Sequence, residues 1–106
     1  MAKKPETLFR EHVVRWLKKL PNTYFTSIQQ RAIRGTPDLL CCIHGLFVGL
    51  ELKAHEKAPV SKLQEYNLSL IAKAGGYALI VCPENWESTK KVLEIYANED
   101  IISFNK

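Results

Sequence analysis

The alternation of hydrophobic and polar positions divides the chain into segments with helical or strand periodicity. Residues 5–20 carry apolar side chains at helical spacing along one face, and Pro21 ends the pattern. These apolar positions are Phe9, Val13, Trp16, Leu17 and Leu20. We therefore predict an amphipathic helix over 5–20, with Pro5 in its first turn.

Three short runs with strand character follow this helix. Residues 23–28 are rich in β-branched and aromatic side chains. A polar, basic connector at 29–35 leads to two apolar runs, 37–43 and 46–53, which only a His-Gly dipeptide separates. A tight turn between two strand-like runs predicts a β-hairpin.

The second half of the chain alternates helical and strand patterns. Residues 61–74 have helical spacing and end at a Gly-Gly pair, which suits a helix C-terminus. Residues 77–82 are almost entirely apolar, which predicts a strand buried on both faces. We expect a last helix over 85–98 and a final short strand over 101–104.

This order of elements predicts an α/β fold. The strand–helix–strand unit at 46–82 requires a parallel pair of strands joined by a right-handed crossover. We expect a mixed sheet of four to five strands flanked by helices on both faces, in the order αβββαβα with an optional last strand. A length of 106 residues fits one domain spanning 1–106.

Two acids and a lysine interrupt the apolar runs of the predicted hairpin. Side chains alternate along a strand, so Glu51 and Lys53 share a face, and the turn brings Asp38 beside Glu51. Neighbouring carboxylates repel unless a cation or proton lies between them, and Mg²⁺ favours one or two carboxylates with phosphate oxygens and water. A lysine there could orient or deprotonate a water, or stabilise charge on phosphate. The alternative is a solvated face with weak pairing, worth about 0–1 kcal/mol.

Composition and charge narrow the classes of partner. The chain is 46% hydrophobic and 25% charged, which is ordinary for a globular protein. Residues 1–35 hold eight Lys and Arg against two Glu, which favours nucleic acid over a membrane as the partner. We expect a cytoplasmic protein, because no apolar run suits a membrane span or a secretory signal. The cysteines 41, 42 and 82 lack metal-binding spacing and are expected to be small buried residues.

The motif residues resemble those of a known nuclease superfamily. "Pro37-Asp38 … Glu51-Leu52-Lys53", with its hairpin and following helix, resembles the PD-(D/E)XK motif. The longer string "RGTPDLLCCIHGLFVGLELK … LQEYNLSLIAKAGGYALIV" resembles the VRR-NUC branch, within which small phage or bacterial nucleases and archaeal Holliday-junction resolvases are similar. The resemblance covers residues 6–82 and implies a restriction-endonuclease-like fold.

The resemblance also implies roles for individual residues. Asp38 and Glu51 would hold a divalent cation, Mg²⁺ or Mn²⁺, together with the backbone carbonyl of Leu52. Lys53 matches the catalytic lysine of the family, and Gln64 matches a glutamine that follows the lysine strand. The pattern Ser-x-x-Gln that ends at Gln64 is also a helix capping box, so both roles stay open for this side chain.

The family places one further glutamate on its first helix. Glu6 lies three residues before Phe9 on the core-facing stripe, whereas Glu11 falls nearly opposite that stripe, so spacing favours Glu6 as the additional metal ligand. Arg31 and Arg34 precede the motif in the basic connector and are expected to contact DNA phosphates.

Together these features predict a metal-dependent endodeoxyribonuclease, and the resemblance suggests branched DNA, such as a four-way junction, as its substrate. One site per chain and two incisions per junction favour a homodimer. Its interface would use either the hairpin around Cys41 and Phe47 or the last helix around Trp86 and Tyr96. The alternatives are a sequence-specific endonuclease of homing or restriction type, and a nucleic-acid-binding module of the same fold without turnover.

Overall fold

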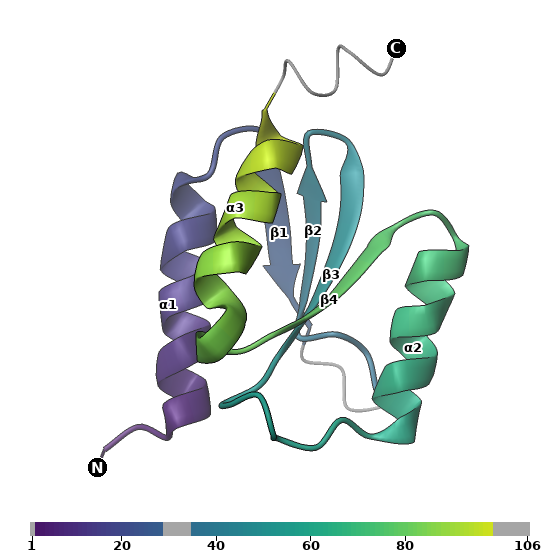
Figure 1. Cartoon of the computed structure of the whole chain (residues 1–106). Helices are drawn as coiled ribbons and strands as arrows, with labels where there is room; N and C mark the ends of the chain where they lie inside the picture. The colour runs from purple at the N-terminus through teal and green to yellow at the C-terminus, as the bar shows by residue number, and fades with distance from the viewer. Residues whose placement is uncertain (1, 29–34, 99–106) are drawn as a thin grey trace.

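The structure is a computed structural model that describes residues 2–28 and 35–98 (Figure 1). The predicted strand at 101–104 lies outside the described residues. In chain order the elements are α1 (Pro5–Lys19), β1 (Thr23–Ser27), β2 (Leu39–Ile43), β3 (Leu46–Leu52), α2 (Lys62–Lys73), β4 (Tyr77–Val81), a 3₁₀ turn η1 (Pro83–Asn85) and α3 (Trp86–Ala97). The predicted α/β class and order of elements are confirmed.

The four strands form one mixed sheet in the order β1-β2-β3-β4. β1, β2 and β3 are antiparallel neighbours, and β4 runs parallel to β3 after the crossover through α2. The hairpin turn places His44 at φ 49° and Gly45 at φ 86°. Both values lie in the left-handed region that a two-residue hairpin turn favours, and this turn sets the β2–β3 register, with Leu39 opposite Leu50.

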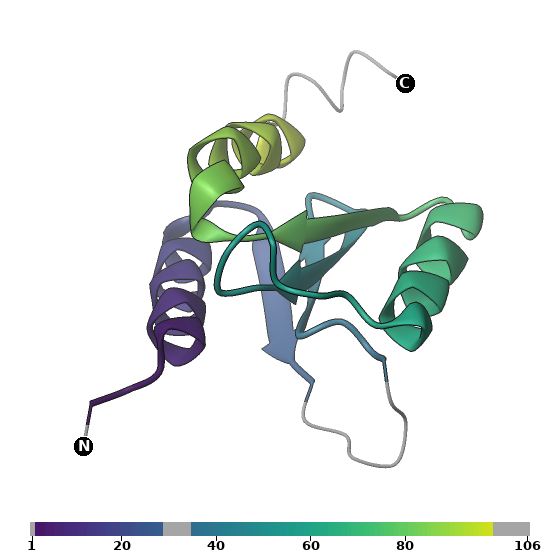
Figure 2. The same cartoon turned by 60° about the horizontal axis from the view of Figure 1, so that its bottom comes forward.

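One face of the sheet is fully covered and forms the hydrophobic core. Figures 1 and 2 show α1 and α3 side by side on this face and α2 on the other. The odd positions of β2 and the even positions of β3 point toward α1 and α3, and all of them are buried except Leu46, which is partly buried. The core residues from these four elements include Leu39, Cys41, Ile43, Val48, Leu50, Leu52, Phe9, Val13, Leu17 and Leu93. The alternate apolar side chains of the hairpin therefore form one continuous apolar layer on this face.

The opposite face of the sheet is covered only in part. α2 packs beside β3 and β4, and a side chain at Gly49 would come within 2.8 Å of the Ile71 Cδ1 atom, so this glycine permits the close approach. Over β1 and β2 the same face is open, and Tyr24 is 74% exposed there. Cys42 is also exposed on it, so the expectation of buried cysteines holds for Cys41 and Cys82 but is wrong for Cys42.

The prediction that the 77–82 strand is buried on both faces is wrong. Tyr77 is 40% exposed and Ile80 is 41% exposed. β4 is the last strand in the sheet order, so it has a neighbouring strand on one side only, and the flanking helices leave part of it uncovered. Among the described residues, no helix combines the length and apolar character that crossing a bilayer requires.

Aromatic side chains join α1 to α3. Trp86 begins α3 and is 4% exposed. Its ring meets Phe9 edge-on, with centroids 5.9 Å apart, and Trp16 with centroids 5.3 Å apart. Edge-to-face pairs of this kind contribute beyond the area that they bury. The Trp86 Nε1 atom is buried and has no hydrogen-bond partner among the described residues, so the ring acts through packing.

We expect the Trp86→Ala substitution to lower the free energy of unfolding by about 3–5 kcal/mol, the usual loss when a large core ring is removed. Trp86→Phe should cost clearly less, because it keeps ring contacts and removes an unpaired N–H group. Ile95→Ala, at a position on α3 that is 51% exposed, serves as the control. Urea denaturation followed by circular dichroism measures all three variants, and equal losses for Ala and Phe at position 86 would contradict the packing role.

Candidate active site

Two carboxylates meet at one end of the sheet. Leu39 pairs with Leu50 across β2 and β3, and one further step in this register places Asp38 opposite Glu51. The backbone carbonyl of Asp38 accepts a hydrogen bond from the Ile28 N–H at 2.9 Å, which holds the start of β2 against β1. The pair that the hairpin spacing predicted is therefore present at the sheet end.

The carboxylate of Asp38 is held at both of its oxygens. Its Oδ2 atom accepts a hydrogen bond from the Leu52 backbone N–H at 2.8 Å. Its Oδ1 atom accepts one from Arg10 Nη2 at 2.6 Å, in an ion pair with side chains 32% and 20% exposed. Arg10 comes from α1, and sequence reasoning missed it. Its only sequence signal is that it lies one helical turn after Glu6, the acid already placed at the site.

Gln64 joins Glu51 to Lys53. Its Nε2 atom donates to Glu51 Oε2 at 2.7 Å, and its Oε1 atom accepts from Lys53 Nζ at 3.1 Å. The Lys53 ammonium also lies 3.4 Å from Glu51 Oε2. The same Gln64 Oε1 atom accepts from the Ser61 N–H, while Ser61 Oγ accepts from the Gln64 N–H, so the capping box is complete. The Gln64 side chain therefore both caps the start of α2 and holds Glu51 and Lys53 in place.

Glu51 is a buried acid, with 3% of its surface exposed. Its pKa is raised from the ordinary 4.5 to about 7, chiefly because burial penalises the charged carboxylate and then because Asp38 adds a second negative charge, while Lys53 opposes the shift. The Glu51 Oε1 atom has no hydrogen-bond partner among the described residues. An unpaired, buried carboxylate oxygen beside a second carboxylate is a position that a cation would stabilise.

Two glutamates of α1 were candidates for a further metal ligand. Glu6 is exposed in the first turn of α1, and its charge adds to the effect of burial on the Glu51 pKa. Glu11 instead pairs with Lys3 at 2.6 Å. Within residues 2–28 and 35–98, no three His, Cys, Asp or Glu side chains form a group able to hold a metal ion. Arg31 and Arg34 lie outside the described residues.

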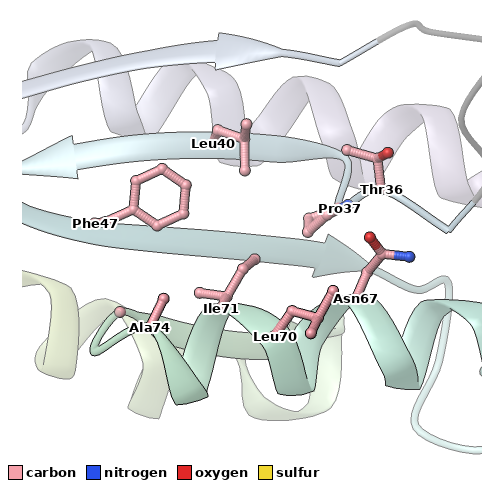
Figure 3. A pocket seen from close by; sticks show the side chains of 9 residues that line it. Thr36, Pro37, Leu40, Phe47, Asn67, Leu70, Ile71 and Ala74 are labelled. Carbon is pink, nitrogen blue, oxygen red and sulfur yellow. The ribbon is translucent and has the colours of Figure 1, made fainter.

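An apolar groove of about 440 Å³ begins next to the site but contains neither carboxylate. Figure 3 shows it between the β2–β3 hairpin and α2, with Leu40 and Phe47 on the strand side and Leu70 and Ile71 on the helix side. Its lining residues are Thr36, Pro37, Leu40, Phe47, Asn67, Leu70, Ile71, Ala74 and Gly76. The two carboxylates thus lie at the sheet end, outside a neighbouring groove that is mostly apolar.

Comparison with models of known protein families finds no match, and comparison with curated proteins finds none. Among solved structures, a "VRR_NUC domain protein" matches with a TM-score of 0.69 and 18% identity over 88% of this chain and 90% of its own. A second structure, a "VRR_NUC domain", matches with a TM-score of 0.73 and 19% identity over 89% of this chain and 99% of its own. At these identities the likeness is one of fold. The chain therefore has the fold of the VRR_NUC domain, the family that its sequence resembles.

The raised pKa of Glu51 makes the stability of the cation-free protein depend on pH. A carboxyl with a higher pKa in the folded state stabilises the fold below about pH 4.5, and this contribution is lost as the pH rises through about 7. We therefore expect Glu51→Gln to raise the free energy of unfolding at pH 8 by on the order of 2–3 kcal/mol relative to wild type, and by little near pH 4.5.

Denaturant unfolding in buffer with a chelator, at several pH values between 4.5 and 8, measures this difference. Glu94→Gln, which removes an exposed carboxylate on α3, controls for the change in net charge. A stability gain that is the same at every pH would contradict the assignment of the shift to Glu51.

Proposed function

We propose that this protein is a metal-dependent endonuclease that hydrolyses phosphodiester bonds in DNA. The observation that carries the proposal is the buried Glu51 carboxylate, which lies beside Asp38 and within 3.4 Å of the Lys53 ammonium and has one oxygen without a hydrogen-bond partner in the described part of the chain. Two acids and a lysine at one point supply cation ligands and a positive charge for a reacting phosphate. The VRR_NUC fold supports this class of chemistry.

The residues present fit a hard divalent cation such as Mg²⁺ or Mn²⁺. Mg²⁺ uses one or two carboxylates and completes its shell with water and substrate oxygens, which suits a site with two adjacent acids. Asp38 and Glu51 would hold the ion, with the Leu52 backbone carbonyl and Glu6 as further candidates. When bound, the cation would polarise the phosphate and lower the pKa of a bound water.

The other side chains of the site would position the reacting groups and stabilise the charge on the phosphate. The Lys53 side chain is 14% exposed and tied to both Gln64 and Glu51, so its ammonium is fixed where it can hold the attacking water or stabilise charge on the phosphate. Gln64 orients Lys53 and Glu51 together. Arg31 and Arg34, in the basic connector, would contact the DNA backbone.

The substrate and the assembly are further parts of the proposal. We infer branched DNA, such as a four-way junction, and a cytoplasmic homodimer that supplies two sites. Cys41 and Trp86 are buried in the single chain, so neither can contact a second copy across a dimer interface. The sheet face around Tyr24 and Phe47, which are 74% and 47% exposed, is the better surface for a second copy, because α2 covers this face only in part and leaves these large side chains exposed.

We expect Asp38→Asn and Glu51→Gln to abolish cleavage of a labelled four-way junction in Mg²⁺. Lys53→Ala should lower the rate at least about 100-fold while junction binding largely survives. Lys73→Ala, on the exposed end of α2, is the matched lysine control.

Cleavage rates and gel-shift affinities, compared with a linear duplex of equal length, separate the alternatives. Cutting of linear DNA at a defined sequence would favour a sequence-specific endonuclease. Tight binding without cutting in any cation would favour a non-catalytic module.

The dimer prediction is tested by light scattering at micromolar concentration. We expect a mass near twice the 12.1 kDa of the chain, and Tyr24→Lys should return it to the mass of one chain. Ile95→Lys changes another exposed apolar position, 51% exposed on α3, and should leave the dimer intact. The reverse result would place the interface on α3, and a single-chain mass for the wild type with and without DNA would refute the dimer.

A further inference from the structure

Arg10 connects α1 to the candidate active site. Its Nη2 atom lies 2.6 Å from Asp38 Oδ1, and its side chain is 32% exposed, so the guanidinium reaches both the acid and the solvent. Neither the motif nor the capping pattern uses this residue. It brings a second positive charge, besides Lys53, into direct contact with one of the two proposed metal ligands.

The contact conflicts with a cation on Asp38. The Asp38 Oδ2 atom already accepts from the Leu52 N–H at 2.8 Å, which leaves Oδ1 as the oxygen better placed to bind an ion. Arg10 occupies that oxygen. A guanidinium and a divalent cation on the same oxygen repel strongly at such short separation. A cation held by the Asp38 and Glu51 carboxylates would therefore displace Arg10.

We propose that Arg10 is a phosphate-binding residue of the site, held by Asp38 until a divalent cation takes its place. Once released, the guanidinium contacts a non-bridging oxygen of the DNA backbone beside the cation. Arginine suits this exchange because it stays charged at all relevant pH values and its planar fork of donors matches both carboxylate and phosphate. The inference rests on the proposed nuclease function and names a further substrate contact for it.

The proposed exchange and a purely structural role of Arg10 predict opposite effects of its removal on cation affinity. If Arg10 served only to orient Asp38, its removal would weaken cation binding, because the ligand would lose its support. If Arg10 competes with the cation, its removal strengthens cation binding and weakens the hold on DNA. The two properties can be measured without any cleavage assay.

Mn²⁺ binding in the absence of DNA, measured by titration calorimetry, tests the competition. We expect Arg10→Ala to bind Mn²⁺ about tenfold more tightly than wild type, because a positive charge next to the ligand is removed. Arg15→Ala, which removes an exposed arginine from the same helix, should leave the affinity unchanged. Weaker Mn²⁺ binding by Arg10→Ala, with its circular dichroism spectrum intact, would overturn the proposal.

Salt dependence of junction binding tests the phosphate contact. In a Lys53→Ala background, which is expected to bind without cutting, Arg10→Ala should reduce the slope of log affinity against log salt by about 0.9 with Mn²⁺ present and leave it unchanged with a chelator. Any effect of Arg15→Ala should be equal in both conditions. The same slope for Arg10→Ala and its parent in Mn²⁺ would overturn the proposal.

The outcomes separate this inference from the nuclease function itself. If Mn²⁺ binds as expected and the slopes change, but wild type cuts no DNA, the exchange stands and the nuclease proposal fails. If Mn²⁺ does not bind wild type at all, both fail together.

Discussion

The burial of one carboxylate, Glu51, is the constraint around which this small protein is organised. A charged acid with 3% exposure is unfavourable unless neighbours stabilise it. Gln64, from α2, and Lys53, directly after β3, stabilise the charge, whereas Asp38, directly before β2, opposes it. The cation-free site is only partly satisfied, since Oε1 has no partner among the described residues. The unfavourable burial of this oxygen therefore lowers the stability of the cation-free protein.

The same arrangement ties helix formation to site geometry. Gln64 closes the capping box at the start of α2 and also bonds Glu51 and Lys53, so the helix cannot shift without moving the site. Gly49 lets α2 approach the sheet closely through Ile71. On the other face, the Trp86 cluster fixes α1 against α3, and α1 carries Arg10 to Asp38. The core thus holds in place the elements that carry the polar site.

The two faces of the sheet differ in how completely helices cover them. The face under α1 and α3 contains the apolar core, whereas α2 covers only part of the other face (Figure 2). The apolar groove, the exposed Tyr24 and the Glu51–Gln64 pair belong to this second side, whereas Arg10 reaches Asp38 from α1. Surface next to the acids is therefore left exposed without disturbing the core.

Local sequence determined the helices, the strands and much of the site. Hairpin spacing and the period of two were sufficient to place Asp38 opposite Glu51, because a short turn and a strand register leave little freedom. The Ser-x-x-Gln pattern predicted the capping box, but its contact with Glu51 and Lys53 required α2 to pack on β3. Only the tertiary structure decided that Cys42 and Ile80 are exposed, since coverage of a strand depends on which helices lie over it. Only the tertiary structure brought Arg10 to Asp38, because that contact joins residues 28 positions apart and depends on where α1 crosses the end of the sheet.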